Sequence, residues 1–188
     1  MLKKTSYSII VLVLVLLHII PFPLQAENAR IGDLLVTNNA NQVLVYARVT
    51  NCFTKDMEAA ILAGVPTTFT FFVELYQERS RWLDTKIASI VMKHTIKYDN
   101  VRRLFYVTID GDGEPASFQD FESAKRAMAD LNGIAMAPLK GLKKSEYYYV
   151  LLKAKLDKVR LPLHMEYVFF FVSLWDFETG WVRERFFY

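Results

Sequence analysis

The segment Asp110-Gly111-Asp112-Gly113-Glu114 is the densest set of potential metal ligands in this 188-residue chain. Carboxylates at alternate positions can converge on one hard cation, and the glycines allow a tight loop. The segment does not match an EF-hand, because Pro115 stands where that loop requires glycine and Phe121 where it requires a bidentate glutamate. We therefore expect an acidic, solvated connection here and no metal site.

Other residues with catalytic potential are sparse. His94 and His164 are the only histidines after the N-terminal segment, and Cys52 is the only cysteine. That set is too small for a structural zinc site, and no G-x-S-x-G nucleophile elbow is present. We expect His94 to be a hydrogen-bonded core residue and Cys52 a buried, unreactive thiol. The sequence thus predicts no catalytic residue, no cofactor and no enzyme, although a triad assembled in space stays open.

Aromatic residues are the most abundant potential binding groups, with 14 Phe, 10 Tyr and 3 Trp. Most should lie in the core or in cross-strand pairs. Tyr147 and Tyr149, which flank Tyr148, and Trp181, which lies near a turn, could instead face outwards and form a recognition surface. Lys140, Lys143 and Lys144 make a small basic turn, for which we expect a solvated loop rather than a docking site for anionic lipid.

The elements that must position these residues are mostly strands, because apolar and polar residues alternate with period two. The clearest apolar faces are Val43, Val45, Ala47 and Val49; Phe69, Phe71, Val73 and Leu75; and Tyr148, Val150, Leu152, Ala154 and Leu156. Residues 168–172 are apolar on both sides, which is typical of a central buried strand. We predict a mainly β fold, an immunoglobulin-like β-sandwich of about eight or nine strands with two short helices.

The first predicted helix begins at Thr54 as N-cap, buries Met57, Ala60 and Ile61, and ends at Gly64. The second begins after Ser117 or Asp120. Its apolar face would comprise Phe121, Ala124, Met128 and Leu131, and Asn132-Gly133 would close it.

The N-terminus has the pattern of a signal peptide. Lys3 and Lys4 precede the apolar run Ile9–Ile20, Pro21 and Pro23 break it, and Ala26 is a small residue at the cleavage position. A retained anchor is the alternative, but the run is shorter than the roughly 20 residues that span a bilayer. We expect residues 1–26 to be a signal peptide and residues 27–188 to form a single β-rich domain without a membrane span.

Charge and cysteine usage agree with an exported protein. The chain has 23 Lys and Arg against 20 Asp and Glu, and cleavage would remove two of the lysines. A nearly neutral domain has no basic footprint for nucleic acid. A single cysteine allows no internal disulfide, which fits a bacterial periplasm better than a small disulfide-stapled fold.

Residues Met57–Pro66, the strand Phe69–Tyr76, Arg81-Trp82-Leu83-Asp84 and Ser117-Phe118 before a helix carry a family resemblance. Together with a hairpin around Trp175 and Trp181, they make the chain similar to the bacterial family called domain of unknown function 4390, over nearly all of the mature chain. The resemblance implies an exported envelope protein of Gram-negative bacteria, often encoded beside a membrane sensor kinase of the nitrogen-regulation type. It transfers no functional residues.

From these observations we expect a non-enzymatic periplasmic interaction or regulatory module that acts on an envelope protein, with a membrane sensor kinase as one candidate partner. A carrier of a small hydrophobic ligand is the alternative, and a hydrolase is the third reading.

Overall fold

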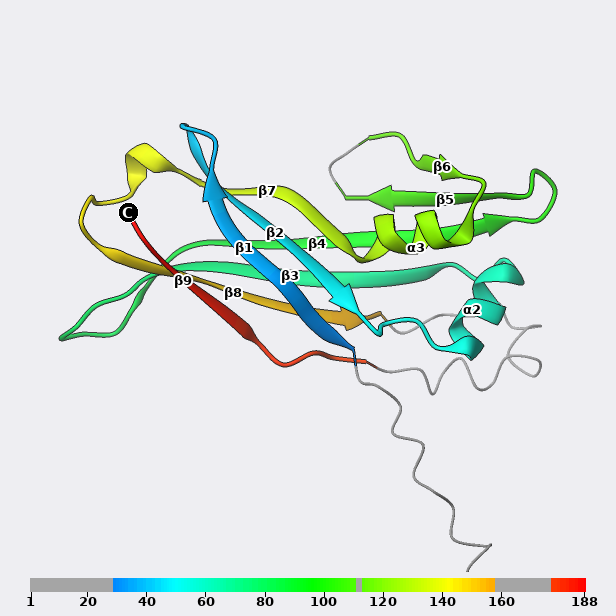
Figure 1. The fold of residues 1–188 in the computed structure, drawn as a ribbon, viewed down its shortest axis with the longest axis horizontal. Coiled ribbons are helices and arrows are strands. Elements are labelled where there is room, and N and C mark those ends of the chain that lie inside the picture. Colours follow the sequence, from blue (N-terminus) through cyan, green and yellow to red (C-terminus); the bar gives the residue numbers. More distant parts are fainter. Residues whose placement is uncertain (1–28, 111–112, 158–176) are drawn as a thin grey trace, which may run out of the picture.

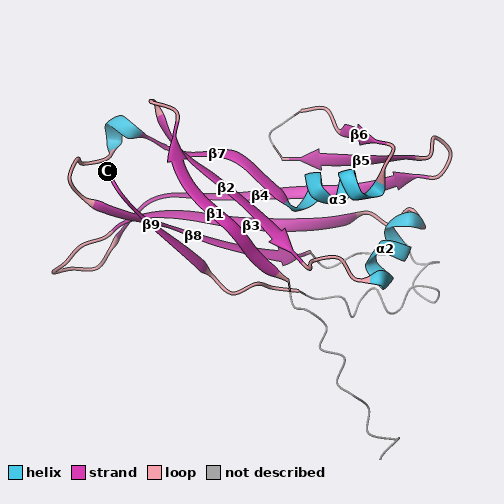
Figure 2. Ribbon diagram, in the orientation of Figure 1, coloured by secondary structure: helices cyan, strands magenta, loops and turns pink. Residues whose placement is uncertain are grey.

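The computed structural model describes residues 29–110, 113–157 and 177–188. In these ranges, nine strands form two antiparallel sheets, joined by two α-helices and one short 3-10 helix. The smaller sheet has the strand order β1-β2-β7 and the larger sheet the order β6-β5-β4-β3-β8-β9. Figure 1 shows the larger sheet along the long axis of the molecule, with β1 and β2 crossing it, and Figure 2 shows how little of the fold is helical.

The strands are β1 (Arg30–Asn38), β2 (Gln42–Thr50), β3 (Thr67–Gln77), β4 (Thr85–Asp99), β5 (Leu104–Ile109), β6 (Ala116–Phe118), β7 (Asp130–Pro138), β8 (Tyr147–Leu156) and β9 (Val182–Phe187). The helices are α2 (Lys55–Leu62), α3 (Phe121–Ala129) and the 3-10 helix η1 (Leu139–Gly141).

The core lies between the two sheets. β3 is central in the larger sheet, paired with β4 on one side and β8 on the other, and the predicted inward residues of β3 and β8 are buried. The inward residues of β2 are also buried, and β1 contacts β8 and β9 while β7 contacts β4. Two antiparallel sheets packed face to face confirm the predicted mainly β, sandwich-type fold.

Helix α2 forms as its sequence predicts. The Oγ1 of Thr54 accepts a hydrogen bond of 3.2 Å from the backbone N–H of Met57, which satisfies one free donor of the first turn. Met57 and Ile61 are buried, and Gly64 follows the helix with a φ of +90°. A positive φ costs glycine little, so the helix ends here.

Helix α3 is shorter than predicted. Asp120 is its N-cap, with Oδ2 accepting from the N–H of Ser123 at 2.8 Å, but the helix ends at Ala129. The prediction that Leu131 continues the helix face and that Asn132-Gly133 closes it was wrong, since both lie in β7. Asp130 is already extended, with φ −94° and ψ 133°, and pairs with Arg48 of β2. Sheet pairing therefore overrides the helical spacing.

Some predictions fall outside the described ranges: the signal peptide over residues 1–26, the buried strand over 168–172, His164 and Trp175. Within the described ranges, no helix has the length and apolar character needed to cross a membrane.

Candidate recognition surface

The outer face of the larger sheet, opposite the core, carries aromatic side chains from three neighbouring strands and from the residue just before β9. The antiparallel register aligns β3, β8 and β9 so that outward residues meet across the strands. We call this set the aromatic face; its members are Phe72, Tyr76, Tyr147, Tyr149, Trp181 and Phe187.

Tyr149 is at the centre of the aromatic face but is almost entirely covered. Its ring stacks on Tyr76, with centroids 5.1 Å apart and planes 8° apart, and the guanidinium carbon of Arg183 lies 3.8 Å above the Tyr149 ring centroid. These neighbours leave Tyr149 only 8% exposed. The expectation that Tyr149 faces solvent is therefore corrected: its side chain points outwards, but residues of β3 and β9 cover it.

The Tyr149 hydroxyl is fixed by an acid from the loop between β3 and β4. It donates to Oδ2 of Asp84 at 2.9 Å. Burial first, and the adjacent Asp84 carboxylate second, raise the pKa of Tyr149 to about 12. The phenol therefore stays neutral at physiological pH and acts as a fixed donor rather than as an acid or base.

Tyr147 is exposed, as predicted, and it forms a pair with Phe187. Tyr147 is 44% exposed and Phe187 61% exposed, with ring centroids 5.0 Å apart. Arg185 lies over Tyr147 with its guanidinium carbon 3.8 Å from the ring centroid, and its Nε donates to Oε2 of Glu78 at 2.6 Å. The ion pair fixes Arg185, so this exposed aromatic pair has a cation of defined position beside it.

Trp181 is also exposed, and it forms a second aromatic patch with Phe72. Trp181 is 46% exposed. The ammonium of Lys153 lies 5.1 Å from the Trp181 ring centroid and 5.4 Å from that of Phe72, and it donates to Glu178 at 2.6 Å. That hydrogen bond holds the pKa of Glu178 below its ordinary value. Val91, 56% exposed, is the cross-strand neighbour of Phe72 and widens this patch.

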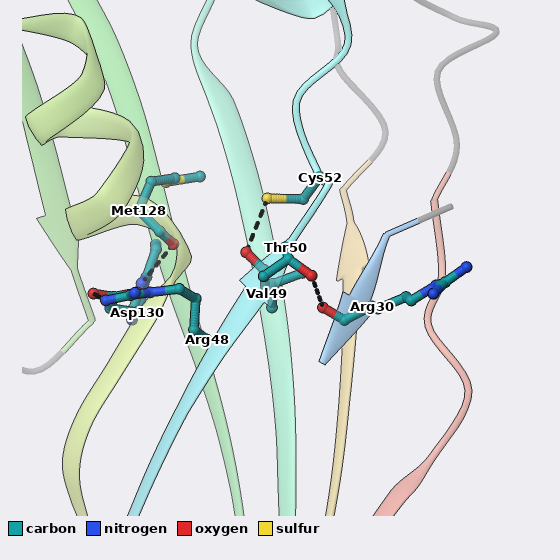
Figure 3. Close-up of polar contacts among 8 residues, drawn as sticks. Arg30, Arg48, Val49, Thr50, Cys52, Met128 and Asp130 are labelled. Carbon is teal, nitrogen blue, oxygen red and sulfur yellow. Dashed lines mark hydrogen bonds and ion pairs between the residues drawn. The ribbon is translucent and has the colours of Figure 1, made fainter. Parts of the chain in front are cut away.

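A second candidate is an open groove of about 380 Å³ between the end of β2 and the two helices. Figure 3 shows two of its lining residues, Arg48 and Asp130, which form a bidentate ion pair with distances of 2.6 and 2.8 Å. Six of its lining residues are charged: Arg48, Glu58, Glu122, Lys125, Arg126 and Asp130. The groove is therefore an open surface of mixed polar and apolar character rather than an enclosed apolar cavity.

The reactive side chains of the groove are held in inactive forms. Burial raises the pKa of the Cys52 thiol to about 12, and its Sγ contacts the carbonyl oxygen of Val49 at 3.5 Å. The predicted burial of this thiol is confirmed. For Lys125, burial lowers the pKa, but hydrogen bonds to Glu122 and Glu58, both at 2.6 Å, outweigh burial and raise it. Lys125 is thus a charged link between α2 and α3, not a nucleophilic amine.

His94 is in the core, as predicted. It is 1% exposed, and its Nδ1 lies 3.0 Å from the carbonyl oxygen of Met128 in α3. Its ring is tilted against Phe71, with centroids 4.7 Å apart. Residues 111 and 112 of the acidic loop are outside the described ranges. Within those ranges, no group of three or more His, Cys, Asp or Glu side chains could hold a metal ion.

Comparison with family models identifies one match. The model described as "Domain of unknown function (DUF4390)" covers residues 26–185. The chain belongs to the DUF4390 family. No curated protein and no solved structure matches it. The resemblance noted in the sequence is thereby confirmed as family membership.

Three of the six residues on the aromatic face of this DUF4390 protein could not be recognised from the sequence as surface residues. Tyr147 and Trp181 stood out by type and position, whereas Phe72, Tyr76 and Phe187 each belong to a run that also contains core aromatics. Alternation along β8 indicated which face of the sheet each side chain occupies. Only the register with β3 and β9 shows which rings contact one another.

Proposed function

We propose that this protein is a non-enzymatic periplasmic interaction module whose aromatic face binds the external domain of an envelope protein. A membrane sensor kinase is the first partner to test. On binding, the module would change the activity of that partner.

The observation that carries the proposal is the exposure of three large aromatics on one sheet face. Tyr147, Trp181 and Phe187 are between 44% and 61% exposed. Exposed apolar groups gathered on one face mark binding surfaces more often than isolated ones do. Tyr, Trp and Arg are the side chains enriched in protein–protein interfaces and in their hot spots.

The charges on this face favour a protein partner of specific shape. Each cation beside an exposed ring has a carboxylate partner: Arg185 has Glu78, and Lys153 has Glu178. A face with fixed, paired charges and little excess of either sign selects partners by geometry more than by bulk attraction. Exposed rings spread over one face of a sheet suit a broad protein surface better than a small molecule.

The periplasmic location is supported by the N-terminal sequence, which has the charged, apolar and small-residue regions of a signal peptide in the right order. The carrier alternative would need an apolar cavity. The groove beside α2 and α3 is open to solvent and half of its lining residues are charged, which does not favour a fully enclosed hydrophobic ligand.

The experiment is chemical cross-linking in living cells of the native host. The tagged protein is purified and the attached proteins are identified by mass spectrometry. We expect one reproducible envelope partner that is lost with Trp181→Ala and Tyr147→Ala. Val101→Ala is the matched control, because Val101 is 94% exposed in the turn between β4 and β5, away from the aromatic face. A partner retained in all three variants, or no partner, would contradict the proposal.

A further inference from the structure

The loop between β3 and β4, residues 78–84, carries two adjacent exposed apolar side chains. Trp82 is 77% exposed and Leu83 is 81% exposed. Figure 1 shows this loop as the extreme left end of the molecule, beyond the rest of both sheets. A single exposed apolar residue needs no explanation, but a tryptophan and a leucine side by side at a protruding tip lose hydrophobic stabilisation unless something covers them.

Basic residues from two distant parts of the sequence surround this tip. Arg79 and Arg81 belong to the loop itself. Lys143 lines one shallow hollow together with Arg79, Arg81 and Trp82, which brings the loop after η1 next to the β3–β4 loop. Within the described part of the chain, none of these cations forms an ion pair, and all are exposed. The same holds for their neighbours Lys140 and Lys144.

Two acidic residues near the tip form hydrogen bonds and ion pairs within the protein. Glu78 pairs with Arg185 at 2.6 Å and with Arg183 at 3.5 Å. Asp84 accepts from the N–H of Arg79 at 2.9 Å and from the hydroxyl of Tyr149 at 2.9 Å. Of the acids around the hollow, this leaves the partly exposed Glu146 against a clear excess of cations.

Both loops are held in place by hydrogen bonds to the sheet. Asp84 closes the β3–β4 loop, and the N–H of Glu78 donates to the carbonyl of Tyr147 at 2.9 Å. The N–H of Lys143 donates to the hydroxyl of the buried Tyr148 at 2.7 Å. The apolar tip and its basic surround therefore have a fixed arrangement before any binding, which lowers the entropic cost of docking.

We infer that this end of the molecule docks on an anionic lipid surface, with Trp82 and Leu83 entering the headgroup region and the surrounding cations contacting lipid phosphates. This inference replaces the expectation from sequence of a merely solvated loop around Lys143, because the fold brings that loop next to Trp82. Tryptophan prefers the membrane–water interface, because its ring is apolar and its N–H needs a polar partner. Anionic headgroups attract nearby Lys and Arg. A convex apolar tip ringed by unpaired cations matches a lipid surface, whereas a protein partner would have to supply a cavity with an acidic rim.

This inference goes beyond the proposed function and does not depend on it. The lipid-docking tip and the aromatic face are separate surfaces, linked by the hydrogen bond between Tyr149 and Asp84. Docking through the tip would hold the aromatic face close to the membrane, where the external domain of a membrane protein is found.

The test is the partitioning of the purified chain, expressed from its full-length gene, onto vesicles of phosphatidylethanolamine and phosphatidylglycerol. Vesicles of phosphatidylcholine alone are the neutral comparison. We expect binding to the anionic vesicles that weakens with salt. The double variant Trp82→Ser with Leu83→Ser should bind about tenfold more weakly, because each apolar contact is lost. Arg79→Gln and Lys143→Gln should each weaken binding about fivefold at low ionic strength.

Val101→Ser is the matched control, since it also removes an exposed apolar side chain from a hairpin turn, and it should bind like the unchanged protein. Quenching of Trp82 fluorescence by brominated lipid, absent in Trp82→Phe, would place the indole in the headgroup region. Equal partitioning of the tip variants and the unchanged protein would overturn the inference. So would capture of the tip by an envelope protein without any binding to vesicles.

Discussion

The hydroxyl of Tyr149 donates a hydrogen bond of 2.9 Å to Oδ2 of Asp84. Tyr149 is the third residue of β8 and lies on the aromatic face, and Asp84 lies in the loop that carries Trp82. The other oxygen of Asp84 accepts from the N–H of Arg79 across the same loop. One carboxylate thus connects the aromatic face to the exposed tip and gives the tip its shape.

Removing this hydrogen bond should loosen the tip without unfolding the sheet. In Tyr149→Phe the ring can still stack on Tyr76, while Asp84 loses a donor. We expect the free energy of unfolding to fall by about 1 kcal/mol, and hydrogen exchange of the Arg79 amide to become faster. Tyr147→Phe is the matched control, because it alters a tyrosine on the same strand whose hydroxyl makes no hydrogen bond within the described residues. An unchanged exchange rate in Tyr149→Phe would contradict the linking role.

Asp157 should make stability depend on pH in the acid range. Burial raises its pKa, but hydrogen bonds from Lys93 at 2.8 Å and Thr70 at 2.6 Å outweigh burial, so its pKa in the folded state is lowered. A lowered folded-state pKa stabilises the fold above the unfolded pKa of about 4, and the contribution is lost as the pH falls further.

Denaturant unfolding at a series of pH values measures this effect. The free energy of unfolding should be level above about pH 5 and should fall below about pH 4. Asp157→Asn should be less stable at neutral pH by about 1–2 kcal/mol and should show a smaller acid-induced decrease. A variant curve parallel to that of the unchanged protein over the whole range would show that Asp157 does not contribute.

A side chain at position 64 should destabilise the fold. Its φ is +90°, and an added Cβ would lie 3.2 Å from Nδ2 of Asn100. We expect Gly64→Ala to lower the free energy of unfolding by about 1–2 kcal/mol, the cost of a left-handed conformation for a residue with a Cβ. Gly141→Ala is the control, because its added Cβ would meet no atom within 4 Å. Similar melting temperatures for the two variants would show that the turn after α2 adapts easily.

Cys52 should not react with alkylating reagents until the protein unfolds. Its pKa of about 12 leaves almost no thiolate at neutral pH, and its side chain is 4% exposed. We expect iodoacetamide to modify Cys52 rapidly in denaturant and negligibly under native conditions, as followed by intact mass. Equal rates in the two conditions would mean that the segment between β2 and α2 opens readily.

The sequence predicted those features that depend on local periodicity. Phe69, Phe71 and Leu75 are buried because alternate residues of a strand share a face, and Thr54 caps α2 because its hydroxyl suits the free N–H groups of a first turn. These relations involve neighbours in the chain, so residue type and spacing are sufficient to find them.

The features that the sequence did not reveal depend on contacts between distant strands. Leu131 continued a helical spacing, but pairing of β7 with β2 placed it in a strand. The alternation along β8 correctly placed Tyr149 on the outer face of the sheet. Tyr76 and Arg183 nevertheless cover its ring from the neighbouring strands. Trp82 and Lys143 appeared unrelated until the fold brought their loops together. Register and sheet order decide these outcomes, and neither is encoded in a single strand.

The most direct test of the proposed function is site-specific photo-cross-linking in the native host. A photoreactive phenylalanine analogue is introduced at position 181 or 147 on the aromatic face, and at position 101 as a control site of high exposure. We expect positions 181 and 147 both to cross-link to the same envelope protein and position 101 not to cross-link to it. Adducts to that protein from position 101 alone, or no adduct from positions 181 and 147, would contradict the assignment of the aromatic face as the binding surface.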